Sequence, residues 1–256
     1  MERFLRETTA VAQVELMKLI RDPTELFSRA VQPVLWLVVF GRVLAQLHGG
    51  EVGGVSYLAF MTPGILAQSV LFSAIFYGIA VIWERDLGVV HKLLVSPARR
   101  SSLVVGKAVS AGFRGLVQTV VISVIALFMH VAIRREPHAI AGVVAAVLLG
   151  SGLFSTFSLI IACIVKTRER FMGIGQVLTM PIFFASNAIY PLSLMPAWLS
   201  AVSHVNPLTY EVDALRALML TQGSSDYGLP LDFAVLAAAT AVLVSIAAKM
   251  YGRMGY

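Results

Sequence analysis

Long apolar runs, separated by short charged or glycine-containing stretches, are the main pattern of this chain. A run of about 20 apolar residues is long enough to cross a bilayer as a helix. The pattern predicts six such spans, at about 29–47, 56–82, 108–131, 139–165, 171–190 and 232–251. Because backbone groups in lipid must be hydrogen-bonded within their own segment, each span is expected to be α-helical. We therefore predict an all-α, polytopic membrane protein in which residues 1–256 form a single transmembrane domain.

Residues 1–28 mix basic and apolar positions instead of forming an apolar run. Val11, Val14 and Leu19 give the segment one apolar face, and lysines and arginines occupy other positions. A helix of this kind lies in the membrane interface with its basic face toward anionic headgroups. Asp22-Pro23 is expected to end this interfacial helix, because proline removes a backbone donor.

Residues 191–231 are apolar but interrupted, which fits neither a full span nor a free loop. Prolines at positions 191, 196 and 207 break the segment into short pieces. The pattern predicts two short re-entrant helices on the extracytoplasmic side, at about 193–204 and 208–220. Tyr190, Trp198 and Tyr210 would then lie at headgroup level, where aromatic side chains are enriched.

Composition excludes a soluble protein of this size. Hydrophobic residues make up 58% of the 256 positions and charged residues 13%, with a mean hydropathy of +0.82. Soluble domains average about 25% charged residues. The net charge of +6 does not indicate nucleic acid as a partner, because membrane proteins collect basic residues in their cytoplasmic loops. Membrane lipid is the expected environment.

The distribution of Lys and Arg predicts the orientation. With the N-terminus inside, fourteen of the 20 basic residues fall in cytoplasmic segments and four in external ones, and Arg29 and Arg114 lie within or at the edge of spans. This positive-inside asymmetry predicts a multi-pass protein of the cell membrane with both termini in the cytoplasm. The single cysteine, Cys163, excludes an intramolecular disulfide.

The longest charged stretch between apolar runs is residues 83–107. It holds five basic residues and two carboxylates, yet keeps an apolar pair, Leu93 and Leu94, near its middle. A simple linker between spans needs neither this length nor the leucines. We interpret it as a docking element for a soluble partner. The alternative is a loop folded on the membrane, with Leu93 and Leu94 in the headgroups.

No catalytic constellation is visible. Gly106-Lys107 is not a phosphate-binding loop, because Ser101 stands where that loop needs its first glycine and Ala108 where it needs Ser or Thr. The histidines lack the spacing of a metalloprotease, and every carboxylate lies near a predicted span boundary. We therefore expect a chain that is not an enzyme and binds no cofactor or metal of its own.

Polar residues inside predicted spans are candidates for a translocation path, because they are costly in lipid. This set comprises Gln68, Arg114, Gln118, Gln176 and Asn187. Alternative readings remain open: Arg114 would lie at the headgroups if its span began at Phe113, and neutral amides often join helices. Four phenylalanines could contact an apolar substrate or simply pack in the core or face lipid, namely Phe72, Phe76, Phe183 and Phe184.

Two groups of residues resemble motifs of the ABC-2 type exporter permeases. The first is Glu84-Arg85-Asp86-Leu87-Gly88 followed by Leu93-Leu94-Val95-Ser96-Pro97. The second comprises Tyr190-Pro191-Leu192-Ser193-Leu194-Met195-Pro196, Trp198, Asn206-Pro207-Leu208-Thr209-Tyr210 and Asp213-Ala214-Leu215-Arg216. The similarity covers nearly the whole chain in order and is greatest to the daunorubicin-resistance type of permease.

The resemblance implies a transport subunit that works with separate cytoplasmic ATPase subunits, which bind ATP and Mg²⁺. It implies two permease chains, either a homodimer or a heterodimer with a close paralogue. It also implies a coupling helix within residues 83–107, formed by the first motif together with His91. Where the family usually has a carboxylate, this chain has His91, which bears on the choice of ATPase. The second motif is implied to form the re-entrant segment.

We therefore expect the permease subunit of an ATP-driven exporter that moves an amphiphilic drug, lipid or glycolipid-type substrate outward. A drug and a lipid-linked molecule fit the sequence equally well. A stand-alone secondary transporter or channel is the alternative, although it would favour buried acidic residues or a filter-like loop. A membrane enzyme or assembly scaffold is a third possibility, which the lack of catalytic residues disfavours.

Overall fold

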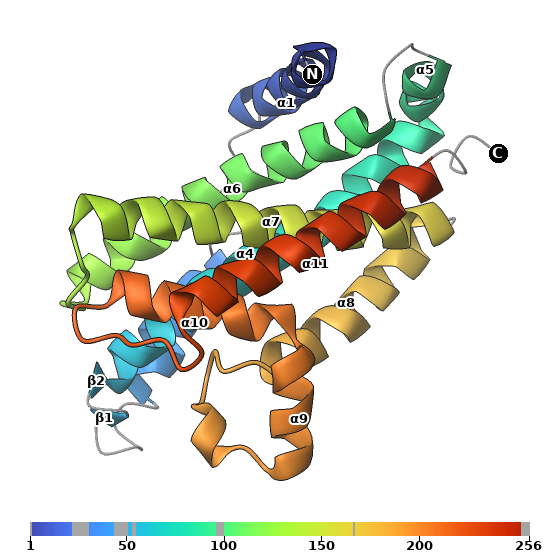
Figure 1. Cartoon of the computed structure of the whole chain (residues 1–256). Coiled ribbons are helices and arrows are strands. Elements are labelled where there is room, and N and C mark those ends of the chain that lie inside the picture. Colours follow the sequence, from blue (N-terminus) through green and yellow to red (C-terminus); the bar gives the residue numbers. More distant parts are fainter. Residues whose placement is uncertain are drawn as a thin grey trace.

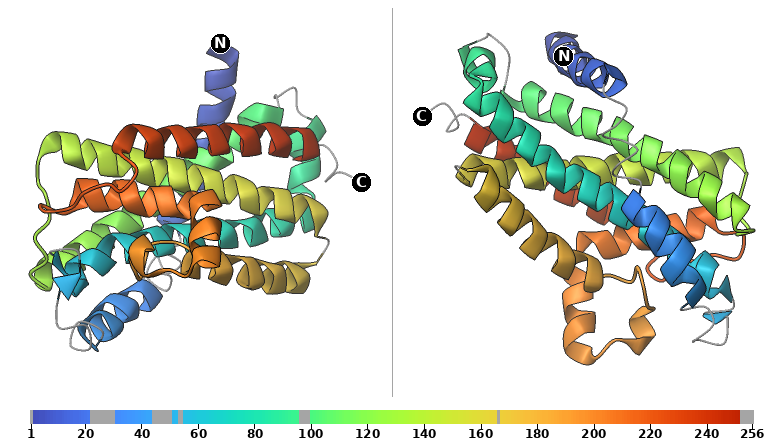
Figure 2. Two further views of the ribbon diagram at one scale, coloured as in Figure 1. Left: turned by 60° about the horizontal axis from the view of Figure 1, so that its bottom comes forward. Right: turned by 180° about the vertical axis from the view of Figure 1, so that it is seen from behind.

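A computed structural model describes residues 2–21, 31–43, 51–52, 55–95, 100–165 and 167–251. Figure 1 shows long helices running side by side, with α1 (Glu2–Arg21) at the top of the view above α6 and α9 (Ala197–Val205) at the bottom. The two views of Figure 2 show α1 projecting from the bundle next to the start of α6. Within the described residues, the only strands are β1 (Glu51–Val52) and β2 (Val55–Ser56), which pair antiparallel. The expectation of an all-α polytopic chain is thus confirmed.

Four helices are long and apolar enough to cross a membrane, counting only the part of the chain that the structure describes. They are α4 (Tyr57–Asp86), α6 (Arg100–Phe128), α7 (Pro137–Ile164) and α11 (Leu229–Met250). The first and fifth predicted spans correspond to shorter helices. Val31–Val43, which contains the π-helical turn η1 (Trp36–Phe40), lies within the first, and α8 (Arg168–Phe184) has 17 residues.

The charged stretch at residues 83–107 is mostly helical in the structure. Helix α4 continues to Asp86, a short helix α5 covers Val89–Val95, and α6 already begins at Arg100. Charged residues can remain in these helices because several of them are paired within the protein. Similarly, α8 begins at Arg168 rather than 171, because the Thr167 side chain caps it by accepting from the Arg170 amide.

Helix α4 forms the centre of the bundle and is the most deeply buried of the four long helices. Small residues allow its neighbours to approach closely. The Ser158 hydroxyl of α7 donates to the Ile75 carbonyl of α4 and accepts from the Gly78 amide at 3.0 Å. A Cβ at Gly64 would collide with the Ala188 carbonyl oxygen. These contacts hold α4 tightly against its neighbours.

The segment after α8 contains η2 (Leu192–Leu194), α9 and α10 (Pro207–Met219), close to the two short helices that were predicted. Asn206 separates α9 from α10: its side chain caps α10 at the Leu208 amide and donates to the Ile182 carbonyl at 2.6 Å. The two helices differ in burial. Nearly all of α10 is buried against α4, α7 and α11, whereas α9 exposes Trp198 and Val205.

Candidate functional site

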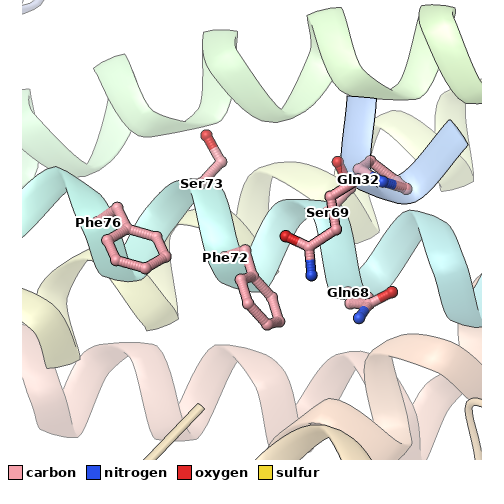
Figure 3. Close-up of a pocket in the computed structure, with 7 residues that line it drawn as sticks. Gln32, Gln68, Ser69, Phe72, Ser73 and Phe76 are labelled. Carbon is pink, nitrogen blue, oxygen red and sulfur yellow. The ribbon is translucent and has the colours of Figure 1, made fainter. Parts of the chain in front are cut away.

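A pocket of about 210 Å³ opens along the central helix α4. Its lining residues come from one stretch of α4 and from the Val31–Val43 helix, and they are Gln32, Pro33, Gln68, Ser69, Phe72, Ser73 and Phe76 (Figure 3). Positions 68, 72 and 76 are four residues apart and share one face of a helix. The pocket therefore combines two aromatic rings with amide and hydroxyl groups, a lining suited to an amphiphilic molecule.

Two buried polar atoms that line this pocket lack hydrogen-bond partners among the described residues. Gln68 and Ser73 are almost fully buried, yet the Gln68 Oε1 and the Ser73 Oγ accept or donate no hydrogen bond there. Buried polar atoms are normally satisfied, so such atoms mark a place where water or a ligand binds. Ser69 instead donates to Gln118 Oε1 of α6 at 3.0 Å. Gln118 thus joins two helices, as one of the two readings of the sequence anticipated.

Arg114 is buried within the helix bundle. Since α6 begins at Arg100, the residue lies about 20 Å along that helix. It is 5% exposed, and its guanidinium lies 4.6 Å from the centre of the Tyr77 ring. Its Nε and Nη1 find no hydrogen-bond partner among the described residues. An arginine so placed is costly and is a candidate for function.

The other predicted path residues lie apart from this pocket. Asn187 is fully buried beyond the end of α8, where its carbonyl accepts from Arg216 Nη2 at 2.7 Å. Gln176 is exposed on α8. Phe183 is fully buried and packs against Trp36, whereas Phe184 is 43% exposed. The five polar residues therefore do not form one continuous path within a single chain.

Three charged residues meet at the other end of α4. The Lys107 ammonium of α6 lies 2.6 Å from Glu84 Oε2 of α4 and 3.4 Å from Glu15 Oε1 of α1. It also lies 5.6 Å from the centre of the Tyr77 ring. All three charged residues are buried. This Lys107 cluster connects α1, α4 and α6 beside the start of the coupling segment.

The Glu84-Arg85-Asp86 triplet is engaged within the protein. Glu84 points inward and its carboxylate pairs with the Lys107 ammonium. Arg85 Nη1 donates to the Val165 carbonyl at 3.2 Å. Asp86 Oδ2 accepts from Arg168 Nη2 at 2.9 Å. These bonds hold the end of α4 against the turn between α7 and α8.

Helix α5 follows a tight turn after Asp86. Gly88 has φ of +73°, a conformation that other residues adopt at a cost. Two apolar side chains project outward here, since Leu87 is 71% and Val95 76% exposed. His91 is also exposed. We call Leu87, which caps α4 just before the turn, and Val95, at the end of α5, the outward apolar pair. The sequence did not single out this pair, because the two adjacent leucines were more conspicuous.

The predicted pair, Leu93 and Leu94, is placed differently from Leu87 and Val95. Leu93 is half-buried and packs against the protein's own core cluster, which includes Val90 and Tyr251. The side chain of Leu94 and all of Ser96 and Pro97 lie outside the described residues. The role of Leu93 and Leu94 in binding an ATPase remains a prediction. The side chains of Leu87 and Val95, by contrast, are exposed on the surface of this chain.

A second polar group links α10 to the loop before α11. Asp213 accepts from the Ser225 hydroxyl at 2.8 Å and from the amides of Asp226 and Tyr227 at 3.1 Å. Burial and the nearby Asp213 carboxylate raise the pKa of Asp226. Arg216 lies 4.0 Å from the centre of the Phe60 ring. The Asp213–Arg216 part of the second motif is therefore structural in this chain.

Glu211 is a buried carboxylate that the sequence analysis placed near a span boundary. It lies on α10, is fully buried, and neither carboxylate oxygen has a hydrogen-bond partner within the described residues. It packs against Gly150 of α7, where a Cβ would collide with its carboxylate. Its burial inside the protein was not predicted from the sequence. No group of His, Cys, Asp and Glu suited to a metal occurs among the residues described.

Comparison with known proteins agrees with this geometry. The profile of the ABC-2 type transporter family matches residues 6–220. A putative transport permease, ycf38, of Cyanophora paradoxa is 30% identical over 84% of this chain and 74% of its own length. The inner membrane transport permease YadH of Escherichia coli K12 is 26% identical over 80% of both chains.

A third relative is named for resistance to a drug. The daunorubicin resistance ABC transporter permease protein DrrB1 of Streptomyces coeruleorubidus is 26% identical over 90% of this chain and 80% of its own length. All three relatives are named as permeases and are similar to this chain over most of its length. Together with the long apolar helices and the motifs at both ends of α4, these matches show that the chain belongs to the ABC-2 type transporter family, as a transport permease subunit.

Proposed function

We propose that this chain is the membrane subunit of an ATP-driven exporter that moves an amphiphilic drug, lipid or glycolipid-type molecule outward. The observation that carries the proposal is the position of α4. One rigid helix has the outward apolar pair Leu87 and Val95 beyond one end and a polar-aromatic pocket at Gln68–Phe76 along its length. Eight to sixteen residues separate Glu84 from the pocket, which is about 12–24 Å along a helix.

A movement imposed on α5 would therefore be transmitted to the pocket through α4 alone. The exposed surfaces of Leu87 and Val95 offer about 1.5–3 kcal/mol each if a partner buries them completely. A cytoplasmic ATPase that closes on ATP supplies both a partner and a movement. In this mechanism ATP and Mg²⁺ bind to the ATPase. The permease contributes the coupling surface, the helix α4 that transmits the movement, and the translocation path.

The size of the pocket supports a second permease copy. Sites for drug-sized ligands usually enclose about 300–1,000 Å³, whereas the α4 pocket of one chain encloses about 210 Å³. Two copies, identical or closely related, would complete a path between them. Each copy is proposed to have six spans, formed by the four long helices, the Val31–Val43 helix and α8. Helices α9 and α10 are proposed to be re-entrant from the outside.

Reconstitution in liposomes with the cognate ATPase tests the proposal. ATP-dependent movement of a fluorescent amphiphile should be observed and should fall when Phe72 is changed to Ala. Phe128→Ala is the matched control, because Phe128 is 80% exposed and far from the pocket along α6. Transport that needs no ATPase would refute the exporter proposal.

The alternative of a stand-alone transporter has one observation in its favour, the buried carboxylate of Glu211. Such residues often carry protons or ions in secondary transporters. The same liposomes distinguish the two functions. A secondary transporter would move substrate in response to a proton gradient without ATPase or ATP, and Glu211→Gln would abolish that movement.

Labelling of single cysteines tests the proposed orientation. In a Cys163→Ala background, a cysteine replacing Arg100 should react only after the cytoplasmic side is opened. A cysteine replacing Ser224 should react in intact cells. Both positions are exposed in the structure. Reaction of both with an impermeant reagent in intact cells would contradict six spans with cytoplasmic ends.

A further inference from the structure

A second cavity lies between the C-terminal half of α6 and the N-terminal part of α7. It encloses about 500 Å³, more than twice the volume of the α4 pocket. Its walls include Leu116, Val120 and Leu127 of α6 and Ile140 and Val144 of α7. Val120 is 63% and Ile140 52% exposed, so the groove is open along its side. We call it the α6–α7 groove.

The length of the groove matches one leaflet of a bilayer. Leu116 and Leu127 mark its extent along α6, and eleven residues of helix cover about 16 Å. The hydrocarbon core of a bilayer is about 30 Å thick, so each leaflet contributes about 15 Å. Both helices are long and apolar enough to cross the membrane. A molecule in this groove would therefore lie parallel to the acyl chains of one leaflet.

Two arginines lie at the end of the groove, in the turn between α6 and α7. Both Arg134 and Arg135 line the cavity. Arg134 is held in place, since its amide donates to the Met219 carbonyl at 2.7 Å and its Nη2 donates to the Thr221 carbonyl at 3.1 Å. A guanidinium has five N–H donors, so this bond leaves donors for another acceptor. The neighbouring Glu136 carboxylate lies 3.1 Å from His138 Nε2.

The apolar groove and the arginine pair at its end together indicate one kind of ligand. Arginine binds phosphate through paired, charge-assisted hydrogen bonds, and an apolar groove within the membrane takes a hydrocarbon chain. A second copy of this protein fits less well, because a two-fold contact would bring two like arginine pairs together. We propose that the α6–α7 groove binds an anionic glycerophospholipid, with its phosphate at Arg134 and Arg135 and an acyl chain along Val120 and Leu127. This site is separate from the α4 pocket and does not depend on the proposed export function.

Photo-crosslinking in nanodiscs tests the lipid site. The probe is phosphatidylglycerol with a diazirine on one acyl chain, and the labelled peptides are identified by mass spectrometry. Wild-type protein should be labelled within α6 and α7 near the groove, and the matching phosphatidylcholine probe should label these helices far less. Two cations near a membrane surface contribute about 1 kcal/mol each. The double variant Arg134→Gln/Arg135→Gln should therefore bind the anionic probe roughly 30-fold more weakly.

Additional variants separate binding from folding. Arg135→Gln alone leaves both Arg134 bonds in place and should lower labelling several-fold. Val120→Trp should fill the groove and block labelling, whereas Val242→Trp is its control, because Val242 is 57% exposed on α11. Arg100→Gln/Arg170→Gln removes two exposed arginines at the other end of the bundle and should leave groove labelling unchanged.

Three results would overturn the proposal. The first is equal labelling of the groove by phosphatidylglycerol and phosphatidylcholine probes. The second is undiminished labelling in the double arginine variant. The third is a disulfide between two copies carrying Val120→Cys in a Cys163→Ala background, which would assign the groove to a second copy of the chain.

Discussion

Lys107 offers the sharpest test of how the coupling end is held together. Its ammonium lies within 3.4 Å of carboxylates from two other helices, Glu84 of α4 and Glu15 of α1. The contact between α1 and α6 is close, since a Cβ at Gly106 would lie 2.7 Å from Val11 Cβ. We consider the substitution Lys107→Met, which keeps most of the side-chain volume and removes the charge.

The expected cost follows from burial. The side chains of Lys107 and Glu15 are 4% and 6% exposed, so solvent screens this pair weakly. Removing one partner of a buried ion pair typically costs about 3–5 kcal/mol. For a chain of this size, each kcal/mol lowers the melting temperature by about 2–4 °C, so a decrease of roughly 6–20 °C is expected.

Thermal unfolding of the purified protein in detergent provides the measurement. Lys249→Met is the matched control, because Lys249 is exposed near the end of α11 and should give a change within about 0.5 kcal/mol. A triple variant, Glu15→Gln/Lys107→Met/Glu84→Gln, should recover most of the lost stability, because it removes all three charges together.

Coupling provides a second readout for the same variant. A crosslink between cysteines at Glu7 and Ser102, whose side chains lie within 2.8 Å of each other, should weaken in Lys107→Met if the cluster holds α1 on α6. ATP-dependent transport should fall with it. If Lys107→Met melts within 2 °C of the wild type and retains the crosslink, the Lys107 cluster does not join the three helices in the way argued above.

Three further predictions use other contacts. Leu87→Ser/Val95→Ser should weaken binding of the ATPase to the permease more than tenfold and leave the melting temperature of the permease unchanged. Co-purification of the ATPase at the wild-type level would contradict this. Gly64→Ala should cost about 1–3 kcal/mol in unfolding free energy, because the new Cβ meets the Ala188 backbone, whereas Gly173→Ala, with open space at its Cβ, should not. Glu211→Leu should raise unfolding free energy by about 1–3 kcal/mol by removing unpartnered buried oxygens, and a lower melting temperature would refute that reasoning.

The sequence alone determined the class of the protein and the order of its segments. Apolar runs long enough for a bilayer are a local property, so they predicted the helices without knowledge of their neighbours. The prolines at 191, 196 and 207 likewise predicted two short helices where α9 and α10 occur. The family resemblance rested on the motifs within residues 84–97 and 190–216, and it was confirmed by the family match over residues 6–220.

The tertiary structure decided which residues face one another. A helix that is apolar on all sides carries no pattern to show which face is buried, so the burial of Arg114 and the pocket beside Phe72 could not be read from the sequence. Glu84 turned inward because Lys107, 23 positions later, lies opposite it in space. The outward apolar pair of Leu87 and Val95 and the burial of Glu211 likewise depend on how α5 and α10 pack, which is a property of the whole bundle and of no local segment.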